Sequence, residues 1–148
     1  MGGHAYWYFV PYQDETQASL DALRAREFEA GRYSPVIRYL KFSEPEFSAQ
    51  NPGKAHKSIK AAIKASAEEG TRSILDIDSV GDVSDYGVAA PLPADRLQQL
   101  YGTAKPTRSM VEGDMGFLED VERGKCIYFV VWEKGAPKET FFAGYSYD

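Results

Sequence analysis

The most constraining feature of the sequence is a pair of β-favouring runs near its C-terminal end. Residues 125–133 and 139–147 are rich in aromatic and β-branched types, and they flank a short polar segment, 134–138, that contains a glycine and a proline. In the first run both alternating sets of side chains are apolar, which is typical of a strand covered on its two faces. The pattern predicts a C-terminal β-hairpin within a covered sheet.

A second run of the same kind lies near the N-terminal end. Residues 5–12 read Ala-Tyr-Trp-Tyr-Phe-Val-Pro-Tyr, and they too predict a strand with two apolar faces. The aromatic share of the chain is 14%, and most of these residues fall on the predicted strands. We therefore interpret the aromatic excess first as sheet packing. Residues 1–4 are expected to be unstructured or foreign to the natural chain, and His4 is given no role.

Helices are predicted between these runs from apolar spacing, caps and glycine stops. The first begins at Asp14, whose side chain is expected to form a capping box with Gln17, and it ends at Gly31. The others are expected over residues 54–69, 93–101 and 107–123. The proline-containing segment 34–53 is expected to be an irregular connection, with a possible short strand over residues 36–42.

The segment between the second and third helices carries alternating apolar and acidic residues. Residues 72–80 predict a half-exposed strand that has Leu75 and Ile77 on one face and Asp76 and Asp78 on the other. Residues 81–91 are expected to be a loop. Together, the elements predict an α+β fold. We expect one domain over residues 1–148, with a mixed, mostly antiparallel sheet, about four helices and the C-terminal hairpin.

The charge is unevenly distributed. The net charge is −5, with 10 basic and 9 acidic residues in 1–74 but 7 basic and 13 acidic residues in 75–148. This balance disfavours binding to nucleic acids and to anionic membranes, and it favours a cationic partner or a basic protein surface. The sequence shows neither a membrane-spanning run nor a secretory signal and has a single cysteine, so we expect a cytoplasmic protein.

Four aspartates around residues 76–85 form the first candidate site: Asp76, Asp78, Asp82 and Asp85. Carboxylates on one strand face and in the following loop suit Mg²⁺ or another hard divalent cation, or an acid–base pair. The commoner interpretation of such a pattern is a solvated strand face followed by turn-forming residues. The spacing does not match an EF-hand loop.

Other catalytic patterns have little support. Cys126 and His56 are candidates for a nucleophile pair, but an early position in an apolar strand favours an inert, packed thiol. Glycine fingerprints for nucleotides and the G-x-S-x-G elbow are absent from the sequence. The arginines in and after the first helix, Arg24, Arg26, Arg32 and Arg38, suit pairing with a carboxylate or phosphate, but Glu27 and Glu29 lie among them and are expected to neutralise them on the helix surface.

Five tyrosines outside the packed strand faces form the second candidate site: Tyr33, Tyr86, Tyr101, Tyr145 and Tyr147. Tyrosine combines an apolar ring with a polar tip, which suits ligand pockets and interfaces. The favoured hypothesis is a small intracellular binding or regulatory domain that acts by protein–protein contact or self-association, without catalytic residues or a cofactor. The alternatives are a small metal-dependent hydrolase or transferase built on the aspartates, and a small-molecule sensor built on the tyrosines.

Overall fold

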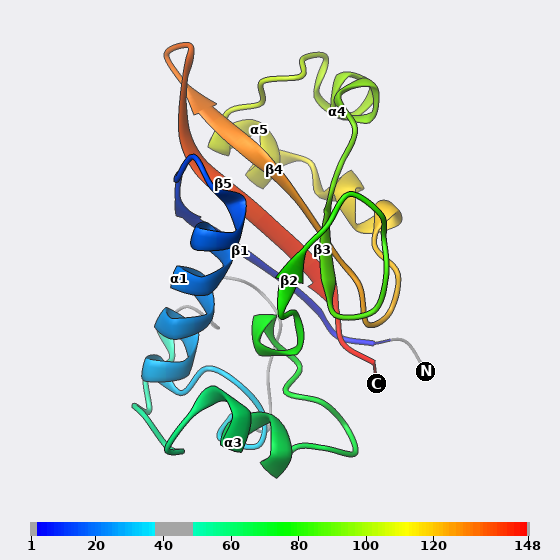
Figure 1. Ribbon diagram of the computed structural model, residues 1–148. Helices are drawn as coiled ribbons and strands as arrows, with labels where there is room; N and C mark the ends of the chain where they lie inside the picture. Colours follow the sequence, from blue (N-terminus) through cyan, green and yellow to red (C-terminus); the bar gives the residue numbers. More distant parts are fainter. Residues whose placement is uncertain (1–2, 38–48, 148) are drawn as a thin grey trace.

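The computed structural model describes residues 3–37 and 49–147 and contains one five-stranded mixed sheet (Figure 1). The strand order is β1-β5-β4-β3-β2. The strands are β1 (Ala5–Pro11), β2 (Ser79–Val80), β3 (Val88–Pro91), β4 (Cys126–Glu133) and β5 (Ala136–Tyr145). Strand β5 pairs antiparallel with both β1 and β4, whereas β3 pairs parallel with both β4 and β2. The predicted α+β class with a mixed sheet is confirmed.

The C-terminal hairpin is confirmed and has a tighter turn than expected. Lys134 and Gly135 connect β4 to β5, and both have positive φ angles, 50° and 77°. Two consecutive left-handed residues characterise the type I′ turn, whose twist matches that of the flanking strands. Pro137 therefore lies inside β5, next to a register shift between Val131 and Trp132. A β-bulge is one of the few places where a sheet accepts proline.

Strand β5 is the centre of the packed part of the sheet. It pairs with β1 along residues 5–11 and with β4 along residues 126–133, and Figure 1 shows it between the two. Phe141, Phe142 and Ala143 are completely buried in it. This pairing brings both chain ends to the same end of the sheet, where the backbone of His4 bonds to Ser146.

The sheet is covered on both faces, as the two-sided apolar strands predict. Helix α1 (Thr16–Ala30) packs on one face, over a cluster that contains Tyr6, Tyr8, Val10, Leu20, Leu23, Ile74, Ile77, Ala89, Cys126 and Phe142. Helices α4 (Ala94–Tyr101) and α5 (Arg108–Gly113) and the 3-10 helix η2 (Met115–Asp120) cover the other face. The core cluster on this second face contains Phe9, Leu92, Leu97, Val111, Phe117, Val121, Ile127, Phe129, Val131, Phe141 and Ala143.

The prediction of a strand over residues 72–80 is wrong. Residues Ile74–Asp76 form a 3-10 helix, η1, and only Ser79–Val80 belong to the sheet. Local side-chain bonds stabilise this alternative, because Asp76 accepts hydrogen bonds from Thr71 and Ser73 accepts one from the Leu75 amide. Three of the four residues 74–77 are buried, so the apolar–acidic alternation does not mark two faces of a strand.

Residues 81–91 are not entirely loop, because β3 lies within them and pairs with β2 and β4. The helix expected over 107–123 is divided at Asp114 into α5 and η2. The Asp114 side chain accepts a hydrogen bond from the Gly116 amide and starts the second helix there.

The remaining helices follow the sequence with shifted starts. Helix α1 ends before Gly31 as predicted, but its N-cap is Glu15, and Gln17 bonds Val80 and Asp21 instead of forming a capping box. Helix α3 (Ile59–Ala65) is shorter than the predicted 54–69. The possible strand over residues 36–42 lies largely outside the described residues. In the part of the chain that the structure describes, no helix has the length and apolar character to cross a membrane.

Candidate functional site

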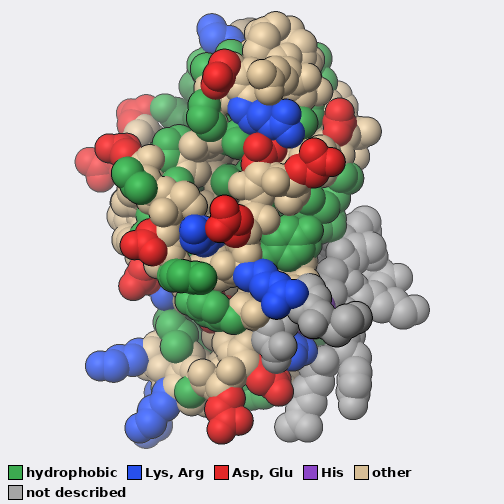
Figure 2. Space-filling view, turned by 90° about the vertical axis from the view of Figure 1, so that its right-hand side faces the viewer, with side chains coloured by type: hydrophobic (Ala, Val, Ile, Leu, Met, Phe, Trp, Pro, Cys, Tyr) green, Lys and Arg blue, Asp and Glu red, His purple; other side chains and the backbone are tan. Residues whose placement is uncertain are grey.

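A cleft of about 660 Å³ lies where the parallel strands β2 and β3 begin. Three parts of the chain contribute to it: α3 and the turn after it, the segments that lead into β2 and β3, and the residues after β5. Six of the lining residues bear on its chemistry and define what we call the tyrosine cleft: Ile63, Glu68, Asp76, Asp78, Tyr86 and Tyr147. Figure 2 views the right-hand side of Figure 1, where the β2–β3 loop lies, and shows hydrophobic, acidic and basic side chains interspersed on this face.

Two of the predicted tyrosines meet in this cleft. The rings of Tyr86 and Tyr147 stack with centroids 6.1 Å apart and an interplanar angle of 24°. Both rings remain open to solvent, with exposed fractions of 64% for Tyr86 and 44% for Tyr147. Partial burial, with the nearby carboxylates of Asp76 and Asp78, raises the pKa of Tyr147, so this phenol stays neutral around pH 7.

Gly124 forms the support behind the two rings. A Cβ atom at this position would lie 2.6 Å from a ring atom of Tyr86 and equally close to one of Tyr147. The Gly124 amide donates to the Tyr145 carbonyl, and its own carbonyl accepts from the Gly87 amide. Only glycine therefore allows the backbone to connect the two tyrosine-bearing segments at this distance.

The two aspartates of the cleft differ in how their carboxylates are used. Asp76 accepts hydrogen bonds from the Thr71 amide at 2.9 Å and from the Thr71 hydroxyl at 2.8 Å. Burial raises the pKa of Asp76 in spite of these bonds. Asp78 is exposed, and its carboxylate has no hydrogen bond or ion pair among the described residues. Asp78 is therefore the carboxylate that remains open to a ligand.

The predicted four-aspartate cation site does not assemble in the described residues. Asp82 and Asp85 do not line the cleft, and Asp85 accepts a hydrogen bond from the Tyr86 amide. No group of three or more His, Cys, Asp or Glu side chains within residues 3–37 and 49–147 is arranged to hold a metal ion. Asp76 and Asp78 do line one cleft, but the Asp76 carboxylate already accepts hydrogen bonds from Thr71, and the loop after β2 does not bring Asp82 or Asp85 to the cleft.

The other three candidate tyrosines lie outside the cleft. Tyr33 is fully buried, stacks on Phe28 and bonds the His56 Nδ1 atom at 2.6 Å. Tyr101 and Tyr145 are half-buried and pack against the cluster beneath α4 and η2. The rings of all three tyrosines therefore pack against core residues and do not line the cleft.

The suggested Cys126–His56 pair also has no geometric support. Cys126 is buried in β4, and burial raises the pKa of its thiol far above the ordinary value. A nucleophilic cysteine needs a lowered pKa and access to substrate. The polar contact that the structure gives His56 is with the Tyr33 hydroxyl.

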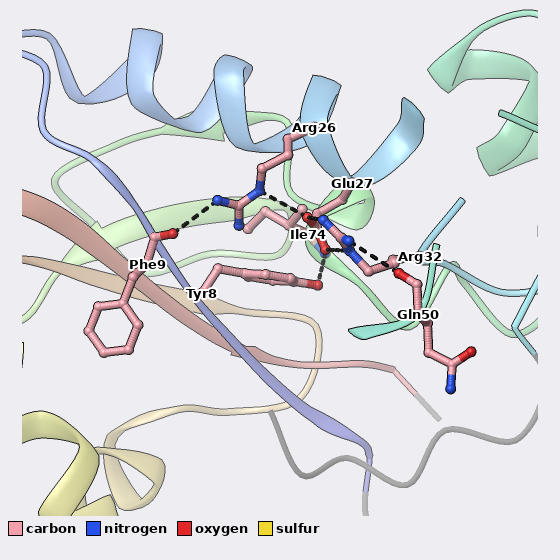
Figure 3. Close-up of polar contacts among 7 residues, drawn as sticks. All are labelled: Tyr8, Phe9, Arg26, Glu27, Arg32, Gln50 and Ile74. Carbon is pink, nitrogen blue, oxygen red and sulfur yellow. Dashed lines mark hydrogen bonds and ion pairs between the residues drawn. The ribbon is translucent and has the colours of Figure 1, made fainter. Parts of the chain in front are cut away.

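The arginine–glutamate group at the C-terminal end of α1, formed by Arg26, Glu27 and Arg32, is a structural clamp (Figure 3). Arg32 binds both carboxylate oxygens of Glu27, at 2.8 and 2.7 Å, and Arg26 binds one of them at 3.0 Å. The two arginines also donate to the Phe9 and Gln50 carbonyls. Glu27 is only 1% exposed, so the predicted neutralisation takes place in the interior and not on the helix surface. The clamp ties α1 to β1 and to the segment at residue 50.

Several residues of the cleft were missed by the sequence analysis. From the sequence, Ile63 and Glu68 belong to the helix predicted over residues 54–69, and Gly124 only follows the end of the helix predicted over residues 107–123. The exposure of the Ile63 side chain becomes evident only from the shorter α3 and the elements around it. No local signal in the sequence links these residues to Tyr86 and Tyr147.

Comparison with known proteins found no matching family model, no similar curated protein and no similar solved structure. The chemistry of the described surface is therefore the basis for a function.

Proposed function

We propose that the protein is a small binding or regulatory domain that acts by protein–protein contact, and that the tyrosine cleft is its contact surface. The observation that carries the proposal is the concentration of exposed apolar groups in the cleft. Large hydrophobic side chains are exposed at six described positions: Ile63, Val83, Tyr86, Met110, Met115 and Tyr147. Three of the six, Ile63, Tyr86 and Tyr147, line this one cleft.

Such a concentration is characteristic of interaction surfaces. Scattered single apolar side chains are ordinary on a protein surface, whereas contiguous ones mark contact sites. Tyrosine is enriched at the centres of interfaces because it buries a large ring and still satisfies its hydroxyl. The stacked Tyr86–Tyr147 pair, with Ile63 nearby, has the composition of such a centre.

The cleft is also held in place before any partner arrives. Gly124 links the two tyrosine-bearing segments through two backbone hydrogen bonds, and Asp76 fixes the turn at Thr71 through its carboxylate. Side chains that are already positioned lose less conformational entropy on binding. These hydrogen bonds fix the shape of the cleft, which supports its interpretation as a recognition surface.

The experiment compares capture by three forms of the immobilised protein: wild type, Tyr86→Ala/Tyr147→Ala and the control Met110→Ala/Met115→Ala. The control removes two exposed apolar side chains away from the cleft. Lysate of the source organism is the probe, and bound proteins are quantified by mass spectrometry. A captured protein counts only after purification and measurement of its Kd.

We expect a partner that binds wild type and control alike and binds the tyrosine variant at least about tenfold more weakly. Sedimentation of the purified protein tests the same cleft for self-association. The proposal is overturned if all captured proteins bind the three forms equally and the wild type sediments as a monomer at all concentrations.

A small-molecule sensor is a second candidate, supported by the cavity volume. Ligand sites typically measure roughly 300–1,000 Å³, and this cleft measures about 660 Å³. Thermal-shift measurements with nucleotides, amines and aromatic metabolites test it, because a ligand that binds the folded state raises its melting temperature. A shift that disappears in Tyr86→Ala/Tyr147→Ala supports the sensor; no shift with any compound counts against it.

A further inference from the structure

We propose that the tyrosine cleft receives a lysine or arginine side chain from an extended basic segment of a partner protein. The inference rests on the proposed function and names the chemistry of the partner. The cationic group would lie against the Tyr86–Tyr147 pair, within reach of the free carboxylates.

The first support is the charge of the cleft. Glu68, Asp76 and Asp78 line it, and the lining contains no Lys, Arg or His. Glu68 and Asp78 are exposed, and neither side-chain carboxylate makes a hydrogen bond or ion pair among the described residues. Surface carboxylates without partners lose little solvation and gain a charge-assisted hydrogen bond when a cationic side chain arrives.

Arg24 is a positive charge close to the two aspartates of the cleft, but it does not form an ion pair with them. Arg24 interacts electrostatically with Asp76 and Asp78, but its Nη2 atom donates to the Leu75 carbonyl at 3.1 Å. Arg24 thus supports the backbone of η1 and makes no direct ion pair with either aspartate. The acidic character of the cleft therefore persists at its open side.

The second support is the aromatic pair itself. Cations are attracted to the faces of aromatic rings at distances up to about 6 Å from the ring centre. The protein already uses Tyr86 in this way, because the Lys125 Nζ atom lies 5.5 Å from its ring centroid. Tyr147 stacks on Tyr86 and is 44% exposed, so its ring extends the surface available to an incoming cation.

The third support concerns the size of the occupant and its approach. A cleft of about 660 Å³ that also has Ile63 on its wall is larger than one side chain and suits a chain segment with apolar neighbours. Residues 75–148 carry 13 acidic against 7 basic side chains, which attracts a basic segment over longer distances. An acidic or phosphorylated segment would meet three carboxylates instead.

The test selects binders from a random peptide library displayed on phage and measures their Kd by fluorescence polarisation. The probes are the selected peptides, the same peptides with citrulline for arginine or acetyl-lysine for lysine, and free spermidine. The variant Glu68→Gln/Asp78→Asn removes the two free carboxylates with little change in shape. The control Asp14→Asn/Glu119→Gln makes the same change in net charge at exposed positions outside the cleft.

We expect the selected peptides to contain lysine or arginine, and to lose at least about tenfold in affinity when that residue is neutralised. A similar loss is expected with Glu68→Gln/Asp78→Asn, and less than twofold with the control. Spermidine should bind much more weakly than the peptides. The inference is overturned if neutral or acidic peptides are selected, if both charge variants bind alike, or if spermidine binds as tightly as the peptides.

These outcomes separate the inference from the proposed function. Selected peptides that depend on Tyr86 and Tyr147 but not on Glu68 and Asp78 would leave the cleft as a protein-contact surface and refute the basic occupant. Peptides that bind Tyr86→Ala/Tyr147→Ala as tightly as wild type would refute the use of the cleft in both proposals.

Discussion

The rings of Tyr86 and Tyr147 stack 6.1 Å apart, although one precedes β3 and the other follows β5. The pairing of β5 with β4 brings the segment after β5, which carries Tyr147, beside the segment that leads into β4. That segment contains Gly124, whose carbonyl accepts a hydrogen bond from the amide of Gly87, next to Tyr86. Neither tyrosine would be in this position without the register of the sheet. The cleft is therefore a product of tertiary structure, formed by segments that meet at one end of the strands.

Gly124→Ala should disrupt this pair and destabilise the fold. The new methyl group would lie 2.6 Å from each ring, at a φ of 75° that disfavours L-residues. We expect a loss of about 2–3 kcal/mol in the free energy of unfolding, measured with urea, and a changed near-ultraviolet dichroism of tyrosine. Gly102→Ala is the control, because Gly102 has a similar φ of 74° with no atom within 4 Å of a new Cβ. Equal losses in the two variants would contradict a specific role of the ring contact.

Asp76 should give the stability a measurable dependence on pH. Burial raises its pKa in the folded state above the ordinary value of 3.8, so the folded state holds this proton more tightly than the unfolded state. The contribution of Asp76 to the free energy of unfolding therefore falls as pH rises from about 4 through the folded-state pKa. Each pH unit between the two pKa values corresponds to about 1.4 kcal/mol.

The measurement is urea unfolding between pH 3 and 8 for wild type and Asp76→Asn, together with a ¹³C titration of the carboxyl carbons. In the variant, the free energy of unfolding should decrease less as pH rises, because residue 76 has no proton to release. A carboxyl pKa below 3.8 for Asp76 in the folded protein would contradict the prediction.

The strongly patterned ends of the chain were predictable because local pattern and tertiary role agree there. In β4 both alternating faces are apolar, and clusters of core residues lie on the two faces of the sheet. The helix ends at Gly31 and Gly102 were likewise predictable, since both glycines adopt the left-handed conformation that closes a helix. These features depend on residues that are close in sequence.

The weakly patterned middle of the chain was not predictable in the same way. Thr71, Ser73 and Asp76 form hydrogen bonds with one another and with nearby amides, which replaces the expected strand by η1. Strand β3 is only four residues long, and its sequence does not indicate a strand. It is recognised as one because it pairs with β2 and β4. Tyr86 and Tyr147 could be selected as candidates because they lie outside the packed strands, but their place in one cleft with Asp78 and Glu68 depends on these long-range pairings.

Cys126 should be inert in the folded protein. It is buried in β4, and burial raises the pKa of its thiol, so both access and the thiolate form are suppressed. We expect a disulfide reagent at pH 8 to react at least about a hundredfold more slowly with the native protein than with the urea-unfolded protein. In the variant Val83→Cys, the new thiol at a position that is 77% exposed should react rapidly under native conditions. Rapid native labelling of Cys126 in the wild type would contradict its place in the core.

Glu27→Ala should be among the most destabilising substitutions in α1. The Glu27 carboxylate accepts three bonds from Arg26 and Arg32, and its loss leaves the half-buried Arg32 guanidinium without its main partner. Removal of one member of such a buried pair costs on the order of 3 kcal/mol. Glu29→Ala is the control, because Glu29 is exposed and its ion pair with Lys54 spans 3.9 Å, which contributes about 0–1 kcal/mol. Urea unfolding at pH 7 measures both losses. Similar small losses in the two variants would show that the clamp does not hold α1 to β1 and to the segment at Gln50.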